Sequence, residues 1–378
     1  MSYSRVRVGD ICAVNKSSYS QKEKWKYVNY LDTGNITNNR IDEIQYIDLI
    51  TEKLPSRAKR KVKHNSIIIS TVRPNQLHYG IIKSQPENFL VSTGFAVIDV
   101  MDDTLDADYL YYVLTQKEIV AHLHAIAEQS TSAYPAIKPS DIQDLEILIP
   151  DLKAQKKIAS LLISIDNRIS INTKINENLE QQAQAIFKSW FVDFEPFGGV
   201  MPDDWQIGML SEIAEISSGK RPPMRQADKT DNVYIPLVGA ASVMGYTNES
   251  NHRDKILVIG RVGTHGIVQR FNVPCWTSDN TLVITSPYYE YTYQVLKQID
   301  YTAMNRGSTQ PLITQGDMNK AEILLPDEEL ILKYERLVGI LFAQHEHNRS
   351  ENVYLANLRD TLLPKLMNGE IDVSQVQI

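Results

Sequence analysis

Apolar residues recur at alternating steps of three and four in two long stretches of the chain, residues 158–190 and 334–366. The second stretch begins with Tyr334 and Leu337. In the middle of each stretch the periodic positions are polar, as at Asn172 and Asn348. This is the seam pattern of a coiled coil, in which polar seam residues specify register. Each stretch predicts a helix of about 40 residues, roughly 60 Å long, and we expect the two seams to pair because neither helix has another core to cover it.

Short β-rich runs bounded by turn residues precede each predicted helix. Examples are residues 66–72, 255–260 and 280–285, and runs of this kind predict strands. Residues 193–205 are rich in Pro and Gly and interrupt the helical period, which is typical of a linker.

The two halves of the chain are copies of each other. Residues 144–151 (DLEILIPD) recur as residues 320–327 (KAEILLPD), an offset of 176 residues. Four further matches keep the same order, between residues 8–14 and 210–216, 92–98 and 278–284, 129–131 and 307–309, and 134–137 and 310–313. Co-linear matches of this kind predict a tandem duplication. Asp151 and Asp327 close the repeated strings at positions where they can cap the helices that follow.

These patterns predict an α+β fold with a pseudo-twofold internal repeat. We expect two mixed α/β domains joined by two long coiled-coil helices. The expected boundaries are 1–150 for the first domain, 151–195 for the central helix, 196–206 for the linker, 207–326 for the second domain, 327–370 for the C-terminal helix and 371–378 for a tail.

Composition narrows the class of protein. Hydrophobic residues make up 43% of the chain and charged residues 22%, and no stretch approaches the ~20 consecutive apolar residues of a membrane span. The opening residues lack the apolar region of a signal peptide, and Cys12 and Cys275 have no metal-binding or redox spacing. We therefore expect a reduced, cytoplasmic protein without a membrane partner.

The net charge of −7 argues against nucleic acid as a partner, because phosphate affinity comes largely from Lys and Arg. The charge is unevenly distributed, however. Residues 53–86 contain eight Lys and Arg and no acidic residue, and smaller acid-free basic runs occur at residues 216–227 and 255–278. Solvated charged faces are the alternative explanation of such runs, but their presence in both copies favours DNA.

Residue type suggests which side chains would contact DNA. In the first copy we expect mainly phosphate contacts from Lys53, Arg57, Lys59, Arg60, Lys61 and Lys63. Arg commonly reads guanine and Gln adenine, so the candidates for base edges or nearby backbone are Arg73, Gln76, His78 and Tyr79. The second-copy counterparts are Lys220, Arg221, Arg225, Arg261, Thr264 and His265, and further candidates in the two copies are Ser130, Thr131, Ser308, Thr309 and Gln310. Structural roles stay open for Tyr79 as a core aromatic, for His78 as a hydrogen-bonded ring and for Ser308 and Thr309 as a turn.

Together these features resemble the specificity subunit of bacterial and archaeal type I restriction-modification enzymes. The resemblance covers essentially the whole chain and rests on the repeat and on residues 146–151 (EILIPD), 154–162 (AQKKIASLL), 178–194 (NLEQQAQAIFKSWFVDF) and 202–205 (PDDW). It implies two target recognition domains that each read one half of a bipartite double-stranded DNA site. It also implies that the two long helices are antiparallel, set the gap and dock two modification subunits, with restriction subunits completing the complex. In such a complex S-adenosylmethionine, ATP and Mg²⁺ act only in the partner subunits, so the chain itself is expected to be non-catalytic and to have no cofactor.

Spare apolar residues on the predicted helices suggest where a partner helix docks. These residues are Leu161, Ile175, Phe187 and Phe191. A pseudo-twofold protein reads half-sites in opposite orientation, and contact with one face of the duplex places the half-site centres about one turn, ~34–36 Å, apart.

Competing functions have weaker support in the sequence. A stand-alone two-headed DNA-binding or scaffolding protein stays an alternative. An amino-methyltransferase would need Asn or Asp before a Pro-Pro pair and an aromatic residue after it. The Pro222-Pro223 pair is flanked by Arg221 and Met224 instead. His345 and His347 lack the i,i+4 spacing of helical zinc ligands, so we expect no metal site.

Overall fold

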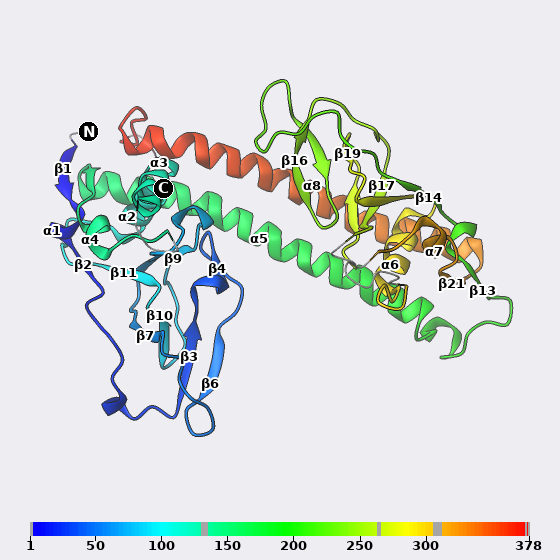
Figure 1. Cartoon of the computed structure of the whole chain (residues 1–378), viewed down its shortest axis with the longest axis horizontal. Coiled ribbons are helices and arrows are strands. Elements are labelled where there is room, and N and C mark those ends of the chain that lie inside the picture. The colour runs from blue at the N-terminus through cyan, green and yellow to red at the C-terminus, as the bar shows by residue number, and fades with distance from the viewer. Residues whose placement is uncertain (1–2, 130–134, 263–265, 305–311, 375, 377–378) are drawn as a thin grey trace. The chain divides into compact units, whose positions relative to one another are not determined.

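The computed structural model describes residues 3–129, 135–262, 266–304, 312–374 and 376 (Figure 1). The chain divides into two compact units. The first unit contains Met1–Ser170 and Glu351–Ile378, and the second contains Ile171–Ser350. Both long helices have residues in both units, so each unit combines one mixed α/β domain with parts of two helices.

Two four-stranded sheets form the domain of the first unit. One sheet has the order β2-β11-β8-β9, with β2 at Cys12–Val14, β11 at Phe95–Val100, β8 at Ile67–Ser70 and β9 at Tyr79–Ile81. The other has the order β6-β3-β10-β7, with β6 at Gln45–Asp48, β3 at Tyr27–Leu31, β10 at Phe89–Ser92 and β7 at Ala58–Lys61. Two-stranded ribbons pair β1 (Ser4–Arg7) with β12 (Glu146–Ile149) and β4 (Ile36–Thr37) with β5 (Arg40–Ile41). The helices of this domain are α1 (Val8–Ile11), α2 (Ala107–Leu114), α3 (Lys117–Glu128) and α4 (Pro139–Gln143), with a short 3₁₀ turn, η3, at Pro74–Gln76.

The second unit repeats this plan in shortened form. Its main sheet has the order β14-β20-β17-β18, with β14 at Glu215–Ser218, β20 at Thr281–Thr285, β17 at Ile256–Gly260 and β18 at Gln269–Phe271. A three-stranded sheet orders β16 (Val243–Thr247), β15 (Ile235–Val238) and β19 (Trp276–Thr277), and a ribbon pairs β13 (Gln206–Met209) with β21 (Glu322–Leu325). The helices are α6 (Tyr289–Gln298) and α7 (Gln315–Asn319).

Equivalent contacts in the two units confirm the predicted duplication. The β1–β12 ribbon places Arg5 opposite Leu148, and the β13–β21 ribbon places Ile207 opposite Leu324. The hydroxyl of Tyr109 on α2 donates to the carbonyl oxygen of Leu148 at 3.0 Å. The hydroxyl of Tyr291 on α6 likewise donates to Leu324 at 2.7 Å. Each domain is therefore tied to its ribbon in the same way.

The two predicted long helices are α5 (Leu152–Phe191) and α8 (Glu328–Met367), each of 40 residues. The carboxylate of Asp151 accepts from the backbone N–H of Ala154 at 2.9 Å, as expected for a helix cap. The helices run antiparallel within each unit. In the first unit Asp166 pairs with Arg359 at 2.7 Å, and in the second the Tyr334 hydroxyl donates to the Ala183 carbonyl at 3.2 Å.

Polar residues do occupy the middle of the seam. Asn172 and Asn348 are 1% and 3% exposed, and Asn348 donates to the Asn176 side chain at 2.9 Å. One part of the predicted seam is wrong, because Leu337 is 43% exposed while Val338 on the same helix is fully buried. The predicted seam steps three residues from Tyr334 to Leu337, whereas the buried position lies four residues on, at Val338.

Both chain ends belong to the first unit. The Tyr3 hydroxyl donates to the carbonyl oxygen of Leu366 at 3.0 Å, and Val373 is 1% exposed within the core of this unit. Lys157 on α5 donates to the Ser374 carbonyl at 2.8 Å. The described residues of the predicted tail thus pack against the fold. No described helix is long and apolar enough to cross a membrane.

Candidate nucleic-acid interface

The turn between β10 and β11 anchors two basic segments of the first unit. The backbone N–H of Thr93 in this turn donates to the Arg57 carbonyl at 2.8 Å. The backbone N–H of Thr71, at the end of β8, donates to the Gly94 carbonyl at 2.8 Å, and its hydroxyl donates to the same oxygen at 2.9 Å. The segments that carry Arg57 and Arg73 therefore meet at one turn.

The turn between β19 and β20 does the same in the second unit. Lys220 donates its backbone N–H to the Thr277 carbonyl at 2.9 Å, and Arg261 donates its own to the Asn280 carbonyl at 2.9 Å. Gly219 passes so close to this turn that a Cβ there would lie 2.0 Å from the carbonyl oxygen of Ser278. Only glycine allows the backbone to pass this close to the turn. This close approach positions the basic segment that begins at Lys220.

We call these two places the turn sites. The first turn site comprises Arg57, Lys59, Arg73 and Gln76, and the second comprises Lys220, Arg221, Arg225 and Arg261. All of these side chains are exposed except that of Arg261, which is half-buried. Each site lies within one unit and presents cations at the end of a sheet.

The hydrogen bonds also correct one predicted correspondence. Ile137 donates its N–H to the Thr71 carbonyl at 2.8 Å, and Ile313 donates its N–H to the Arg261 carbonyl at 3.0 Å. Arg261 therefore occupies the place of Thr71, two residues before the position of Arg73. Sequence reasoning paired residues by type, whereas the backbone register pairs them by position.

A strained turn presents Arg73 and Gln76. Arg73 and Leu77, which flank η3, have φ values of 48° and 58°, a left-handed conformation that costs a non-glycine residue about 1–3 kcal/mol. Neighbouring segments hold the turn in place. Arg73 donates its N–H to the Pro135 carbonyl at 2.9 Å, and Asn38 donates to the Leu77 carbonyl at 2.8 Å. Strain maintained in this way is typical of functional turns.

His78 and Tyr79, also predicted to contact DNA, are used by the fold. Tyr79 is 7% exposed, and its hydroxyl donates to the Asn38 side chain at 3.2 Å. Burial raises the pKa of this hydroxyl. Nδ1 of His78 lies 2.7 Å from the carbonyl oxygen of Ile36. The structural roles left open for both residues are the ones that the structure shows, and the base-contacting role of Tyr79 is withdrawn.

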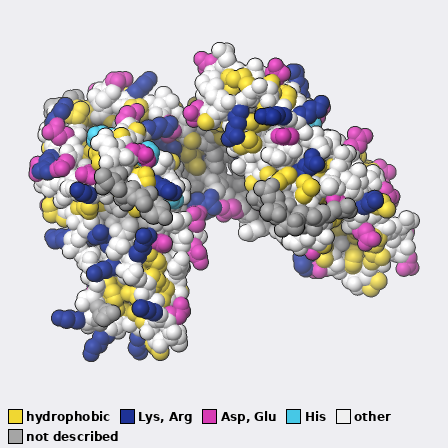
Figure 2. All heavy atoms as spheres, viewed as in Figure 1, with side chains coloured by type: hydrophobic (Ala, Val, Ile, Leu, Met, Phe, Trp, Pro, Cys, Tyr) yellow, Lys and Arg dark blue, Asp and Glu magenta, His cyan; other side chains and the backbone are white. Residues whose placement is uncertain are grey.

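The structure divides the predicted phosphate-binding run into exposed and half-buried residues. Lys53, Arg57, Lys59 and Lys63 are exposed, and on the face shown in Figure 2 Lys and Arg side chains are spread over the first unit among acidic and neutral ones. Lys61 instead pairs with Glu23 and lies 5.1 Å from the centre of the Trp25 ring. Arg60 is half-buried, burial lowers its pKa, and its Nε has no hydrogen-bond partner in the described part of the chain.

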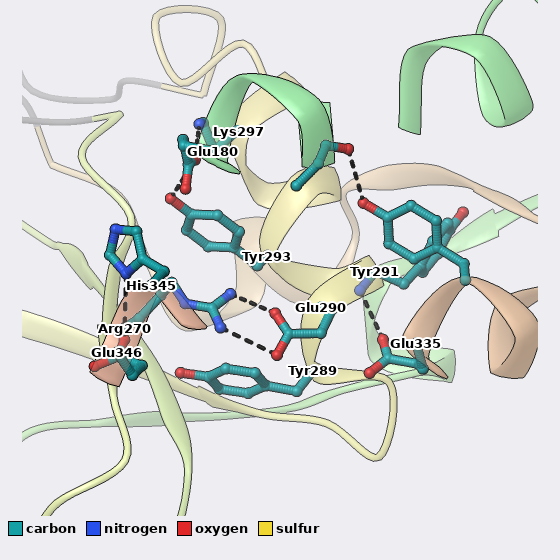
Figure 3. A network of polar contacts seen from close by, with 12 residues as sticks. Glu180, Arg270, Tyr289, Glu290, Tyr291, Tyr293, Lys297, Glu335, His345 and Glu346 are labelled. Atoms are coloured by element: carbon teal, nitrogen blue, oxygen red, sulfur yellow. Dashed lines mark hydrogen bonds and ion pairs between the residues drawn. The ribbon is translucent and has the colours of Figure 1, made fainter. Parts of the chain in front are cut away.

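Arg270, which belongs to an acid-free basic run, is buried instead of facing DNA. Its side chain and that of Glu290 are 10% and 6% exposed and form a bidentate pair, with N–O distances of 2.5 and 3.0 Å (Figure 3). The guanidinium carbon lies 3.7 Å from the centre of the Phe342 ring and within 4.8 Å of the ring centres of Tyr289 and Tyr293. A count of basic residues could not reveal this pair, because Glu290 is 20 residues away in sequence.

Further polar contacts attach α6 to both long helices in the second unit (Figure 3). Glu180 on α5 accepts from the Tyr293 hydroxyl at 2.8 Å and from Lys297 at 2.6 Å. Glu335 on α8 accepts from the backbone N–H of Tyr291 at 2.7 Å, in the first turn of α6. Burial, assisted by the nearby charge of Glu290, raises the pKa of Glu335 to about 7. These side chains therefore position the second domain on its helices.

Two of the four residues predicted to form a subunit interface are not surface residues. Phe187 and Phe191 are 4% and 5% exposed and pack against Tyr291 in the core of the second unit. Leu161 is half-buried against the core of the first unit. Ile175 is 40% exposed and stays available to a partner. Large aromatic residues near the end of α5 thus pack in the core of the second unit.

Several predicted site residues lie outside the described residues. These are Ser130, Thr131, Thr264, His265, Ser308, Thr309 and Gln310. Within the described ranges no group of three or more His, Cys, Asp or Glu residues is arranged to hold a metal ion. Cys12 and Cys275 are buried, and burial raises their pKa values to about 12 and about 11.

Comparison with known proteins agrees with this architecture. A family model described as the type I restriction modification DNA specificity domain matches residues 2–181 and 202–334. The chain belongs to this family. It is 26% identical to the Type I restriction enzyme HindI specificity subunit of Haemophilus influenzae, over 90% of this chain and 94% of that protein. It is 27% identical to the Type I restriction enzyme MjaIX specificity subunit of Methanocaldococcus jannaschii, over 98% and 93%.

A solved structure shares the fold. The type I restriction-modification system S subunit from M. genitalium matches with a TM-score of 0.60 and 18% identity, over 97% of this chain and 96% of that chain. The similarity extends over both units, as expected for a fold built by duplication.

Proposed function

We infer that the chain is the DNA-recognition subunit of a type I restriction-modification complex and that each turn site contacts one half of a two-part double-stranded DNA target. One observation carries this inference. The same backbone hydrogen bond, from Thr71 to Gly94 and from Arg261 to Asn280, brings basic segments to the same turn in both units. A duplicated fold that brings cations to the same turn in both units, at positions that differ between the two copies, is suited to reading two different half-sites.

The side chains at the turn sites divide into two roles. Arg57 and Lys59 in the first unit, and Arg221 and Arg225 in the second, are exposed cations suited to phosphates, which position a protein on the duplex. Arg73, on the strained turn, is our proposed reader of a base edge in the first half-site, together with the exposed amide of Gln76.

The chain itself is proposed to be non-catalytic and to act in the cytoplasm. Methyl transfer, with S-adenosylmethionine, is assigned to two modification subunits, and ATP- and Mg²⁺-dependent steps to restriction subunits. Exposed apolar residues on the long helices support such docking, since Ile175 and Ile340 are 40% and 71% exposed. The continuous helices α5 and α8 are proposed to set the unread gap between half-sites.

The proposal is tested by expressing the chain with its neighbouring candidate modification subunit in a methylation-free host and mapping modified bases by single-molecule sequencing. We expect a new methyladenine motif in two halves separated by an unread gap. If the complex forms and no new motif is found, the role in methylation is wrong and the alternative, a DNA-binding or scaffolding role without methylation, is favoured.

A variant experiment assigns the turn sites. Changing Arg57 and Lys59 to Gln should weaken DNA binding evenly across sequences and reduce its salt dependence. Matched changes of Lys174 and Arg336 to Gln, at exposed cations on the long helices, should leave the first half-site and the salt dependence unchanged. Equal effects of the two variant pairs would remove the turn site from the interface.

A further inference from the structure

Each unit contains a groove between its domain, its ribbon and one end of a long helix. The groove of the first unit has a volume of about 370 Å³ and is lined by α2, β12 and the end of α8, including Pro364 and Met367. The groove of the second unit has a volume of about 210 Å³ and is lined by α6, β21 and the end of α5, including Phe187 and Phe191. The internal repeat has therefore produced a groove at the equivalent place in both units, although the two grooves differ in volume and in the helix end that forms one wall.

The correspondence between the two grooves is set by hydrogen bonds. Because Tyr109 and Tyr291 donate to the equivalent carbonyls of Leu148 and Leu324, each position on α2 corresponds to one on α6, and each on β12 to one on β21. Five lining positions carry the same residue in both grooves: Val113 and Val295, Gln116 and Gln298, Glu146 and Glu322, Ile147 and Ile323, and Leu148 and Leu324.

Core packing explains only some of these five matching pairs. Val113 and Ile147 are each 4% exposed, so the fold itself requires apolar side chains there. Leu148, in contrast, is 41% exposed, and Glu146 and Glu322 are exposed at the rim. Exposed positions are normally free to change.

Neighbouring exposed positions on the same ribbons have changed. Arg5 and Arg7, which face outward from β1, correspond by register to Ile207 and Met209 on β13. Asp144, which pairs with Arg7, corresponds to a lysine in the second copy. The α2–β12 and α6–β21 walls of the grooves therefore carry the same residues in both copies, whereas the helix-end walls and the surface beside the grooves have diverged.

We propose that the two grooves bind two copies of one apolar segment of the modification subunit, one copy in each groove. This rests on the proposed function and explains why the copies agree at exposed positions, since two identical partners need two matching surfaces. The apolar floor fits aliphatic side chains. The rim carboxylate of Glu322 suits a Lys or Arg of the partner, whereas Glu146 already pairs with Arg5 of this chain at 3.1 Å. The Glu322 carboxylate disfavours DNA as the occupant, because it repels phosphate.

Stoichiometry tests the proposal directly. Leu148→Asp, Leu324→Asp and the double variant are each co-expressed with the neighbouring modification subunit. The mass of each complex is measured by native mass spectrometry, and the affinity for the modification subunit is measured by titration. The wild-type chain is expected to bind two partner subunits. Each single variant should bind one, with affinity for the second reduced by at least about tenfold, and the double variant should bind none. Both leucines are partly exposed, and thermal unfolding of each variant verifies that it folds.

Controls carry the same chemical change outside the grooves. Ile50→Asp in the first unit and Val273→Asp in the second alter residues that are 76% and 48% exposed, and both variants should still bind two partners. If the double variant binds two partners with wild-type affinity, the groove proposal is overturned while the recognition function stands. If the wild-type chain binds no modification subunit, the partner assignment and the groove proposal are both overturned.

Discussion

Replacing Glu335 by Gln should make the stability of the second unit less dependent on pH. The carboxylate of Glu335 is held at the first turn of α6, where it accepts from the Tyr291 N–H at 2.7 Å. Burial raises its pKa from 4.5 to about 7. Gln keeps an oxygen that can accept the same hydrogen bond but carries no charge, so the substitution removes the cost of ionisation and little else.

The direction and size of the change in unfolding free energy follow from proton linkage. Between pH 4.5 and about 7 the folded protein keeps a proton on Glu335 that the unfolded chain has released, so the stability of the wild type falls as pH rises through this range. A shift from 4.5 to about 7 corresponds to about 3 kcal/mol. The amide of the variant replaces a group that is neutral below this window and charged above it. The variant should therefore match the wild type near pH 4.5 and exceed it by up to about 3 kcal/mol at pH 8.

Thermal unfolding from pH 4.5 to 8.5 measures this difference. For a unit of this size about 3 kcal/mol is roughly 6–12 °C in Tm. Glu329→Gln, at an exposed position on the same helix, is the matched control and should track the wild type within about 0.5 kcal/mol. A Glu335→Gln difference that stays constant across the pH range, or a variant that is less stable at pH 8, would refute the reasoning.

Three further predictions concern single residues. Arg270→Ala leaves Glu290 buried without its cation and should destabilise the second unit by about 3–5 kcal/mol, measured by urea unfolding; a loss below about 1 kcal/mol would contradict the buried pair. Gly219→Ala forces a Cβ against backbone and should cost about 1–3 kcal/mol, whereas Gly316→Ala, whose Cβ would meet its nearest neighbour at 3.8 Å, should cost less than about 1 kcal/mol in the same assay. Arg73→Ala should relax methylation specificity at one position of one half-site and weaken binding by about 1–3 kcal/mol; an unchanged motif with unchanged affinity would exclude it as a base reader.

Local patterns in the sequence were sufficient to predict the long helices and the repeat. The three-four spacing, the capping Asp151 and the polar seam residues Asn172 and Asn348 all act over one or two helical turns, so they can be read without knowledge of the partner surface. The error at Leu337 has a related cause. An apolar residue one position from the seam satisfies the same period within a turn, and only the packing partner decides between it and Val338.

Long-range pairing decided the roles of individual charged and aromatic residues. Arg270 has the same sequence signature as Arg221, yet one is buried against Glu290 and the other is exposed. Phe187 and Phe191 suit a subunit interface by spacing, but the domain of the second unit covers them.

The sequence by itself determined the α+β class, the duplication, the two 40-residue helices and the family resemblance, because these follow from periodicity and repetition along the chain. Only the tertiary structure decided which cations stay in solvent, that Arg261 stands in the place of Thr71, and that the two copies share a groove. Those properties depend on contacts between segments that are far apart in sequence, where burial and hydrogen-bond register, rather than residue type, set what a side chain can do.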